Sequence, residues 1–296
     1  MSLFSLLGAL EIGLIFSLVA LGVLISFRLL RFPDLTVDGS FPLGGAVAAT
    51  LISGGMDPFS ATVAATAAGA VAGLITGWLN VRLRIMDLLA SILMMIALYS
   101  VNLRIMGRPN VPLITEPTVF TILQPAWLSD YVARPLILVG VVVAVKLLLD
   151  WFLATQTGLA MRATGSNGRM ARAQGVNTGG MILAGMALSN ALVGLAGALF
   201  AQTQGGADIS MGIGTIVIGL AAVIVGESIL PSRKMVLATL AVILGAIVYR
   251  FFIALALNSD FIGLQAQDLN LVTAVLVTIA LVIPMMKRRL LGKKGA

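Results

Sequence analysis

Long apolar stretches separated by short polar connections make up most of the chain. The apolar runs fall at about 3–27, 41–53, 57–80, 86–106, 135–155, 178–204, 210–230, 235–257 and 269–286. Most of them approach the ~20 residues that an α-helix needs to cross the hydrocarbon core of a bilayer. The run at 41–53 is too short, unless the segment from Asp34 onward also lies at membrane depth as part of a broken or re-entrant helix. The pattern predicts an all-α, polytopic integral membrane helical bundle with about nine membrane segments.

Composition narrows the possible chemistry. Of the 296 residues, 59% are hydrophobic and 10% are charged, whereas about 25% are charged in an ordinary soluble domain. The sequence holds no Cys and no His, which excludes disulfides, thiolate or imidazole metal sites and His- or Cys-based catalysis. We therefore expect no catalytic residue and no metal site. The net charge of +7 is spread between the apolar runs, so nucleic acid is not an expected partner.

The loop charges predict an orientation. If the N-terminus is outside, one set of loops and the tail hold fourteen basic residues and the opposite set holds three. The larger set is Arg28, Arg31, Arg82, Arg84, Arg162, Arg169, Arg172, Arg233, Lys234, Lys287, Arg288, Arg289, Lys293 and Lys294. Because cytoplasmic loops carry the excess of Lys and Arg, we expect the N-terminus outside and the C-terminus in the cytoplasm.

Small residues mark a helix-packing face. Gly69, Gly73 and Gly77 continue a four-residue spacing that begins at Ala61 and Ala65. Small residues at this spacing allow the backbone of a neighbouring membrane helix to approach closely.

We expect one transmembrane domain that covers 1–296. Weak internal sequence similarity indicates that it contains an inverted repeat. A glycine-rich run, a proline break and a long apolar run occur after Asp38 and again after Met211. By the expected topology the two copies start on opposite sides, which is a pattern typical of transporters. The repeats would cover about 34–155 and 179–286, with a cytoplasmic segment at about 156–178 and a basic tail at 287–296. Chance similarity between Gly/Ala-rich helices is the alternative explanation.

Polar residues and glycines in or beside the short Gly-rich segments and in the run at 178–204 are the candidates for a translocation pathway, and the Gly-rich segment is the better candidate for lining it. The candidates are Asp34, Thr36, Asp38, Gly39, Ser40, Ser189, Asn190, Gly212, Gly214 and Thr215. For the two carboxylates themselves we favour the interpretation that they pair with Arg28 or Arg31 at the inner interface. For Ser189 and Asn190, hydrogen bonding between helices is the commoner outcome. At Gly212 and Gly214, close helix approach and a backbone break both remain open.

The segment at 158–178 is too long for a tight hairpin and is patterned. Ser166 or Asn167 can cap a helix start, and Gly175 is placed as a stop. The result would be one short helix across the inner face that exposes Met170 between Arg169 and Arg172. Such a helix suits docking into a groove on a partner, although a basic loop at the lipid surface is an equal alternative.

The run at 158–178, the following sequence at 186–227 and the segment at 31–44 (RFPDLTVDGSFPLG) resemble a known family. They are similar to the membrane permeases of bacterial ATP-binding-cassette importers of the branched-chain amino acid permease family. The branch described as tryptophan/tyrosine-type import permeases is the most similar. One departure is that the Glu-Ala-Ala consensus of many such importers appears here only as Met170-Ala171-Arg172-Ala173, with Gly175.

The resemblance implies partners and a role for the cytoplasmic segment. Two permease chains, as a homodimer, would form the pathway in the bacterial inner membrane for a small polar solute, such as an aromatic or other amino acid. A cytoplasmic ATPase dimer would carry ATP and Mg²⁺, and an extracytoplasmic binding protein would deliver the solute. The residues that would couple to the ATPase are Gly165, Ser166, Asn167, Arg169, Met170, Ala171, Arg172 and Gly175.

The chain itself has no GxxxxGK[ST] loop, so we expect it to bind no nucleotide or other cofactor. The main alternative is a secondary transporter driven by an ion gradient, in which Glu11 and Asp34 would bind a proton or cation. The scarcity of intramembrane acids and the absence of His argue against that alternative. Lys146 and Asp150 are spaced to pair with each other on one helix face.

Overall fold

The computed structural model describes residues 3–124, 129–232 and 234–257, together with the single positions 275, 278 and 282. The helices are α1 (Leu3–Val23), the π-helical turn η1 (Leu24–Leu29), α2 (Val37–Ser53), α3 (Pro58–Val81), α4 (Asp87–Met106), α5 (Val119–Leu123), α6 (Asp130–Ala154), α7 (Gln156–Ser166), α8 (Gly168–Ala173), α9 (Thr178–Gln204), α10 (Thr215–Ile229) and α11 (Met235–Leu257). The strands are β1 (Asn110–Pro112) and β2 (Gly206–Asp208). The expected apolar run at 269–286 and the tail at 287–296 lie outside the described residues, apart from the three single positions.

The predicted all-α membrane bundle is confirmed. Within the described chain, six helices are long and apolar enough to cross a membrane: α1 continued by η1, α3, α4, α6, α9 and α11. Two further helices in the same ranges are shorter, since α2 has 17 residues and α10 has 15. The expected count of nine segments is therefore not confirmed.

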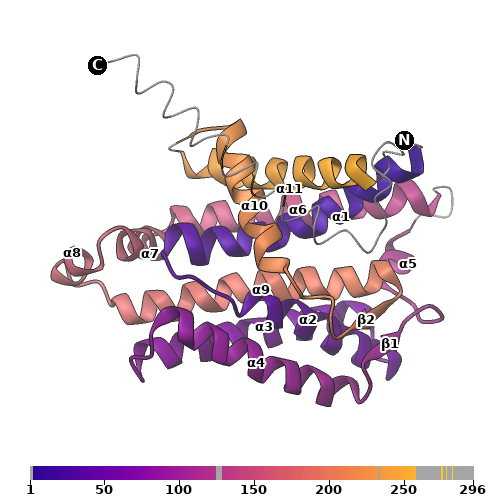
Figure 1. Ribbon diagram of the computed structural model, residues 1–296, viewed down its shortest axis with the longest axis horizontal. Helices are drawn as coiled ribbons and strands as arrows, with labels where there is room; N and C mark the ends of the chain where they lie inside the picture. The colour runs from indigo at the N-terminus through magenta and orange to yellow at the C-terminus, as the bar shows by residue number, and fades with distance from the viewer. Residues whose placement is uncertain are drawn as a thin grey trace.

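The long helices lie side by side with two distinct ends (Figure 1). The short helix α8 projects at one end, called here the α8 end, and β1, β2 and α5 lie at the other, called the ribbon end. Helix α9 runs through the middle, with α2, α3 and α4 on one side and α1, α6 and α11 on the other (Figure 1). Helix α1 starts at the ribbon end and finishes near the α8 end.

Helix α9 is the centre of the packing, and its closest neighbour is α3. The expected small-residue stripe lies at this contact. Gly69 faces the carbonyl of Asn190, Gly73 faces the carbonyl of Met186, and Gly77 lies against Leu183. A Cβ at Gly73 would collide with the α9 backbone. Small residues therefore permit a backbone-to-backbone approach that larger side chains would prevent.

An aromatic cluster fills the core towards the ribbon end. The Phe41 ring of α2 is fully buried and lies 5.7 Å from the Phe16 ring of α1 and 5.4 Å from the Phe200 ring of α9, between ring centroids. These distances fall within the range of favourable aromatic contacts. The cluster joins three helices that are far apart in the sequence.

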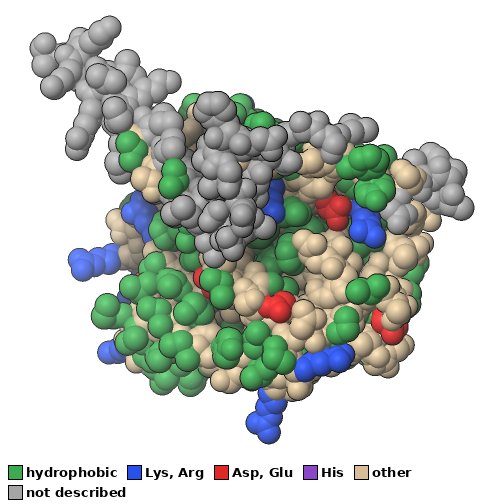
Figure 2. Space-filling model, turned by 45° about the vertical axis from the view of Figure 1, so that its right-hand side comes forward, with side chains coloured by type: hydrophobic (Ala, Val, Ile, Leu, Met, Phe, Trp, Pro, Cys, Tyr) green, Lys and Arg blue, Asp and Glu red, His purple; other side chains and the backbone are tan. Residues whose placement is uncertain are grey.

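The outer surface of the bundle is apolar. Leu93 and Ile96 of α4 and Leu147 and Leu148 of α6 are among the exposed large side chains. Figure 2 shows hydrophobic side chains gathered over the lower left of the visible face, with several Lys and Arg side chains projecting at its margins. A surface of this kind suits contact with lipid rather than water.

A short antiparallel ribbon closes the ribbon end. Strand β1 follows α4, strand β2 follows α9, and Val111 pairs with Ala207 at their centre. Two further backbone hydrogen bonds extend the pairing, from Leu113 N to Gly205 O and from Ile209 N to Pro109 O. Sequence analysis did not predict this ribbon.

Candidate functional site

The chain between η1 and α2 returns into the protein as a non-helical segment. Phe32, Asp34 and Thr36 are buried along it, and Asp34 is only 1% exposed. The hydroxyl of Ser91 on α4 donates a hydrogen bond to the carbonyl of Pro33 at 3.2 Å. Irregular backbone of this kind is tolerated at membrane depth only where protein surrounds it. Helix α2 therefore begins inside the bundle, at Val37.

Asp34 is held by neutral donors. One carboxylate oxygen accepts from the backbone N–H of Thr36 at 3.0 Å, and the other accepts from the amide of Asn190 on α9 at 2.8 Å. The pairing with Arg28 or Arg31 that we favoured from the sequence is wrong, because the guanidinium of Arg28 instead contacts Glu227 at 2.7 Å. The carboxylate thus ties the start of α2 to α9, with hydrogen bonds to the charged oxygens offsetting part of its burial cost.

Asp38 lies in the first turn of α2 and contacts the start of α10. Its carboxylate accepts from the backbone N–H of Ile216 at 2.7 Å and from that of Gly214 at 3.3 Å. This partner also differs from the expected arginine. Helix N-termini carry partial positive charge, so one carboxylate serves the N-terminal ends of both short helices.

Close packing at Gly212 and Gly214 reinforces this junction. Pro42 interrupts the hydrogen bonding of α2 at the Asp38 carbonyl, and a side chain at Gly212 would collide with that carbonyl and the Pro42 ring. Gly214 has φ +81° and immediately precedes α10, a conformation that favours glycine. Thr215 follows and is buried.

The remaining polar candidates bind neighbouring helices. The Thr36 hydroxyl lies 2.9 Å from that of Thr76 on α3, and the Ser189 hydroxyl donates to the carbonyl of Gly22 on α1 at 2.7 Å. Gly39 packs against Leu98 of α4. Thr36, Ser189 and Asp34 therefore provide polar links between the start of α2, α3, α9 and α1.

A polar group that sequence analysis missed lies beside them. The amide of Asn102 on α4 donates to the carbonyl of Gly39 at 3.2 Å. Three buried oxygens have no hydrogen-bond partner within the described chain: Oγ of Ser40, Oδ1 of Asn102 and Oδ1 of Asn190. Buried polar atoms are nearly always satisfied in proteins, so such a group is a place for water or a polar solute. The signal in the sequence was a lone Asn in an apolar run.

We use the term half-helix junction for this set. It comprises Asp34, Thr36, Asp38, Asn190, Gly212, Gly214 and Thr215. Its two short helices meet with their N-terminal ends inside the bundle (Figure 1).

The segment at the α8 end folds as two helices, whereas one was expected. Gly165 and Ser166 finish α7, and Asn167 caps α8 by accepting from the N–H of Met170 at 3.1 Å. Helix α8 ends before Gly175, which has φ +83°. The expected short helix, its cap at Asn167 and the stop at Gly175 therefore appear in the structure as α8, and α7 is a further helix that the sequence did not predict.

The side chains of α8 divide into two faces. Ala171 is buried against the bundle, whereas Met170 is 62% exposed and Arg169 and Arg172 are also exposed. Arg172 donates to the hydroxyl of Thr178 at 3.0 Å, which orients it beside α9.

Helix α7 contacts the end of α1 directly. The backbone at Gly165 lies against the carbonyl of Leu29 in η1, and no side chain would fit between them. Arg28 of η1 forms the ion pair with Glu227 of α10. A chain of contacts therefore leads from α7 through η1 to α10.

The predicted pair of Lys146 and Asp150 is confirmed, with a direct hydrogen bond between the two side chains. Asp150 also accepts from the hydroxyl of Thr239 at 2.7 Å. This pair fastens α6 to α11.

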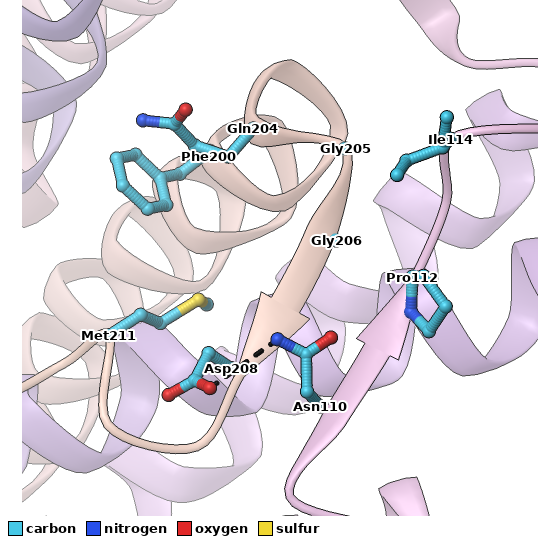
Figure 3. Close-up of a pocket in the computed structure, with 9 residues that line it drawn as sticks. All are labelled: Asn110, Pro112, Ile114, Phe200, Gln204, Gly205, Gly206, Asp208 and Met211. Carbon is cyan, nitrogen blue, oxygen red and sulfur yellow. Dashed lines mark hydrogen bonds between the residues drawn. The ribbon is translucent and has the colours of Figure 1, made fainter.

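A pocket of about 390 Å³ lies at the ribbon end. It was not predicted. Its lining residues come from the ribbon and from α9 and the chain that follows it (Figure 3): Asn110, Pro112, Ile114, Phe200, Gln204, Gly205, Gly206, Asp208 and Met211.

Two short helices that meet inside an apolar bundle are typical of membrane transport proteins, and the comparisons agree. Residues 5–284 match the family model described as the branched-chain amino acid transport system permease component. The chain belongs to this family, as its resemblance implied. It is a multi-pass membrane permease rather than a catalytic enzyme.

Two relatives are similar over nearly their whole length. The tyrosine transport system permease protein of Clostridioides difficile (strain R20291) is 36% identical over 90% of this chain and 86% of its own. An uncharacterised protein of Rickettsia prowazekii (strain Madrid E) is 35% identical over 93% of this chain and 96% of its own.

Proposed function

We propose that the chain is the permease subunit of an ATP-driven amino acid importer, working as a homodimer in the bacterial inner membrane. A cytoplasmic ATPase dimer would bind ATP and Mg²⁺, and an extracytoplasmic binding protein would deliver the solute. Tyrosine and other aromatic amino acids are the first solutes to test, because one relative carries the name of a tyrosine transport system permease.

The exposed face of α8 carries this proposal. Met170 projects from the helix as an isolated apolar side chain, flanked by the exposed cations Arg169 and Arg172. An apolar anchor with a charged rim is suited to a groove on a protein partner. The α8 end would then be cytoplasmic, in agreement with the orientation predicted from the loop charges.

The contacts behind α8 supply a mechanical route. A push on α8 reaches α7, then the Leu29 backbone of η1, and then Glu227 of α10 through Arg28. Rigid-body displacement of packed helices is a common way to transmit such a movement. ATP hydrolysis on the partner would in this way move the short helix that borders the half-helix junction.

The half-helix junction is the proposed route of the solute. Broken helices whose N-terminal ends meet near the middle of a bundle are typical of transporter binding regions. The buried Ser40, Asn102 and Asn190 oxygens without partners in the described chain give such a route polar acceptors.

The test is uptake of radiolabelled L-tyrosine and of the other amino acids by proteoliposomes that contain the permease, its ATPase and its binding protein. We expect uptake to need ATP and to be indifferent to a proton gradient. The double variant Arg169→Glu with Met170→Asp should lower uptake and solute-stimulated ATP hydrolysis by about tenfold or more, because it opposes both the charge and the apolar contact of the interface.

Arg82→Glu with Leu83→Asp is the matched control. Leu83 is 53% exposed, close to the 62% of Met170, and Arg82 is also exposed. This pair changes the same charge and polarity on another basic loop, so it should leave uptake near the wild-type rate. Uptake driven by a proton gradient without ATP, or equal loss in both double variants, would contradict the proposal.

A further inference from the structure

We infer that the pocket at the ribbon end, called here the ribbon pocket, is the first docking site for the solute and holds its ammonium group against Asp208. The inference rests on the proposed function, because it places the pocket at the start of an importer's translocation route. Neither the family description nor the named relatives assign a site to this part of the chain.

The shape of the pocket suits a single amino acid. Gly205 and Gly206, which have no side chains, lie among its lining residues between two groups of side chains (Figure 3). Pro112 and Ile114 lie on one side, and Phe200 lies on the other. A volume of about 390 Å³ is at the small end of the range for ligand sites, about 300–1,000 Å³.

Among the described residues that line the pocket, Asp208 is the one with a charge. Its carboxylate accepts from the backbone N–H of Ser210 at 2.8 Å, from the Ser210 hydroxyl and from the Asn110 amide at 3.4 Å. The hydrogen bond from the Ser210 hydroxyl lowers the pKa of Asp208 below its ordinary value, so the group is negative at neutral pH.

One acceptor position on Asp208 remains for a ligand. A carboxylate offers about four lone-pair sites, and in the part of the chain that the structure describes three hydrogen bonds are donated to it. An ammonium group fits the remaining position as both a cation and a donor. A carboxylate-only solute would instead meet a like charge.

The rest of the pocket matches the other parts of an amino acid. The side-chain amides of Asn110 and Gln204 are neutral donors for the solute's carboxylate. Phe200 and Met211 offer an aromatic ring and a polarisable thioether to an apolar or aromatic side chain. None of the described lining residues is a cation that would compete for Asp208, and Arg108 precedes the ribbon outside them.

The pocket adjoins the proposed route. The Phe200 ring at its wall packs on Phe41 of α2, and the Met211 side chain lies against Gly45 of α2. The next residue, Gly212, belongs to the half-helix junction. Phe200 and Met211 therefore separate a solute in the pocket from the junction, and their displacement would open the way.

The absence of Cys from the sequence makes a direct test possible. Ile114→Cys places a single thiol on the pocket rim, at a position that is 84% exposed. The full-length variant, in lipid nanodiscs at low ionic strength, is labelled with a cationic and an anionic methanethiosulfonate. Both rates are divided by the rates for a free thiol. We expect the cationic reagent to be favoured by about fivefold or more, as one nearby unscreened charge predicts.

Substitutions at Asp208 give the expected pattern of change. The quantity compared is the normalised labelling rate of the cationic reagent divided by that of the anionic reagent. Asp208→Asn should bring this ratio close to one, and Asp208→Lys should make it smaller than one. Asp57→Asn is the matched control, because Asp57 is an exposed acid outside the pocket and Asn caps a helix as well as Asp does. It should leave the ratio unchanged. A ratio that Asp208→Asn does not alter would overturn the inference.

Protection tests the ligand in the Ile114→Cys background alone, without any change to Asp208. L-tyrosine, a mixture of the other amino acids and tyramine are compared with 4-hydroxyphenylpropanoate, which lacks the ammonium group. Millimolar tyrosine or the mixture, and also tyramine, should slow labelling by about twofold or more, and the acid should not. Equal protection by the acid, or no protection by any of them, would refute the docking site.

The two proposals can fail separately. ATP-driven uptake by the assembled importer without protection in the pocket would remove only the docking site. Protection without ATP-driven uptake would leave a solute site at the ribbon end and remove the proposed importer function.

Discussion

The pairs α2–α3 and α10–α11 share a plan but differ in how they are held. In each, a short helix precedes a long one. In the described chain, twelve of the 17 residues of α2 are buried, against six of the 15 residues of α10. Both α2 and α3 pack on the central helix α9, whereas α10 packs mainly on its own partner α11 and then on α1. The α2–α3 pair is thus part of the core of the bundle, whereas the α10–α11 pair packs on the outside of that core.

The difference suggests a division of labour between the pairs. Asp34 and Thr36 attach α2 to α9 and α3 through buried hydrogen bonds. Helix α10 is attached to the first half by Asp38 at one end and by the exposed Arg28–Glu227 pair at the other. We infer that α10 is the element that moves during transport and that α2 is the fixed wall against which it moves.

The largest expected effect is on the yield of folded protein, and it comes from disrupting the contact between α3 and α9. Gly73→Val would drive a side chain into the Met186 carbonyl of α9, and collisions with backbone have no low-cost relaxation. We expect the yield of monodisperse protein after detergent extraction to fall by about tenfold. Gly140→Val is the control, because nothing lies within 4 Å of an added Cβ there. Equal yields for the two variants would mean that the α3–α9 contact does not organise the fold.

A smaller loss is expected from Asp34→Ala. The change leaves the Thr36 N–H without its side-chain acceptor and the Asn190 amide with only the Met186 carbonyl, and a buried donor that loses its acceptor costs about 1–3 kcal/mol. The melting temperature, followed by tryptophan fluorescence, should fall clearly. Asp34→Asn retains one acceptor, so its melting temperature should lie between those of the wild type and Asp34→Ala. A melting temperature equal to wild type for Asp34→Ala would show that α2 is not fixed by this carboxylate.

Asp38→Ala should loosen α10 without loosening α2. Its hydrogen bonds to Gly214 and Ile216 are charge-assisted and contribute about 1.5–3 kcal/mol in comparable settings. Hydrogen exchange should rise in the first turn of α10, while peptides from the middle of α2 keep their protection. Equal deprotection of both helices would remove the distinction between a fixed and a moving element.

The smallest effect is expected from Glu227→Gln. The ion pair with Arg28 is exposed, with 61% and 40% of the two side chains accessible, and such pairs contribute only about 0–1 kcal/mol. We expect a slight fall in melting temperature at low salt that disappears at about 0.5 M salt, where screening is strong. The variant should affect the rate of uptake more than stability. Unchanged uptake at low salt would exclude this contact from the route between α8 and α10.

The sequence predicted those features that depend only on residues close together in the chain. The apolar runs anticipated every long helix of the described chain, because lipid requires about 20 apolar residues per crossing. The spacing of Lys146 and Asp150 predicted their contact, since residues four apart share a helix face. The helix cap at Ser166 or Asn167 was also predicted, and the structure has it at Asn167.

Distant contacts were not predictable in the same way. Asp34 is paired with Asn190, which lies 156 positions away, and nothing near Asp34 in the sequence identifies that partner. The nearby arginines made a local ion pair the obvious expectation, yet the chain turns back into the bundle and carries Asp34 away from them. The ribbon escaped prediction because each strand has only three residues, and the pocket exists only once that ribbon forms.

The ribbon also limits how the two halves can separate. It ties the chain after α4 to the chain before α10 by backbone hydrogen bonds, among them Leu113 N to Gly205 O at 2.7 Å. Helix α10 is then a lever whose pivot is near its first turn. With 15 residues at about 1.5 Å each, it is about 22 Å long, so a 5° tilt displaces its far end by about 2 Å. A small swing would therefore widen the proposed solute route at the α8 end while the ribbon pocket stays nearly still.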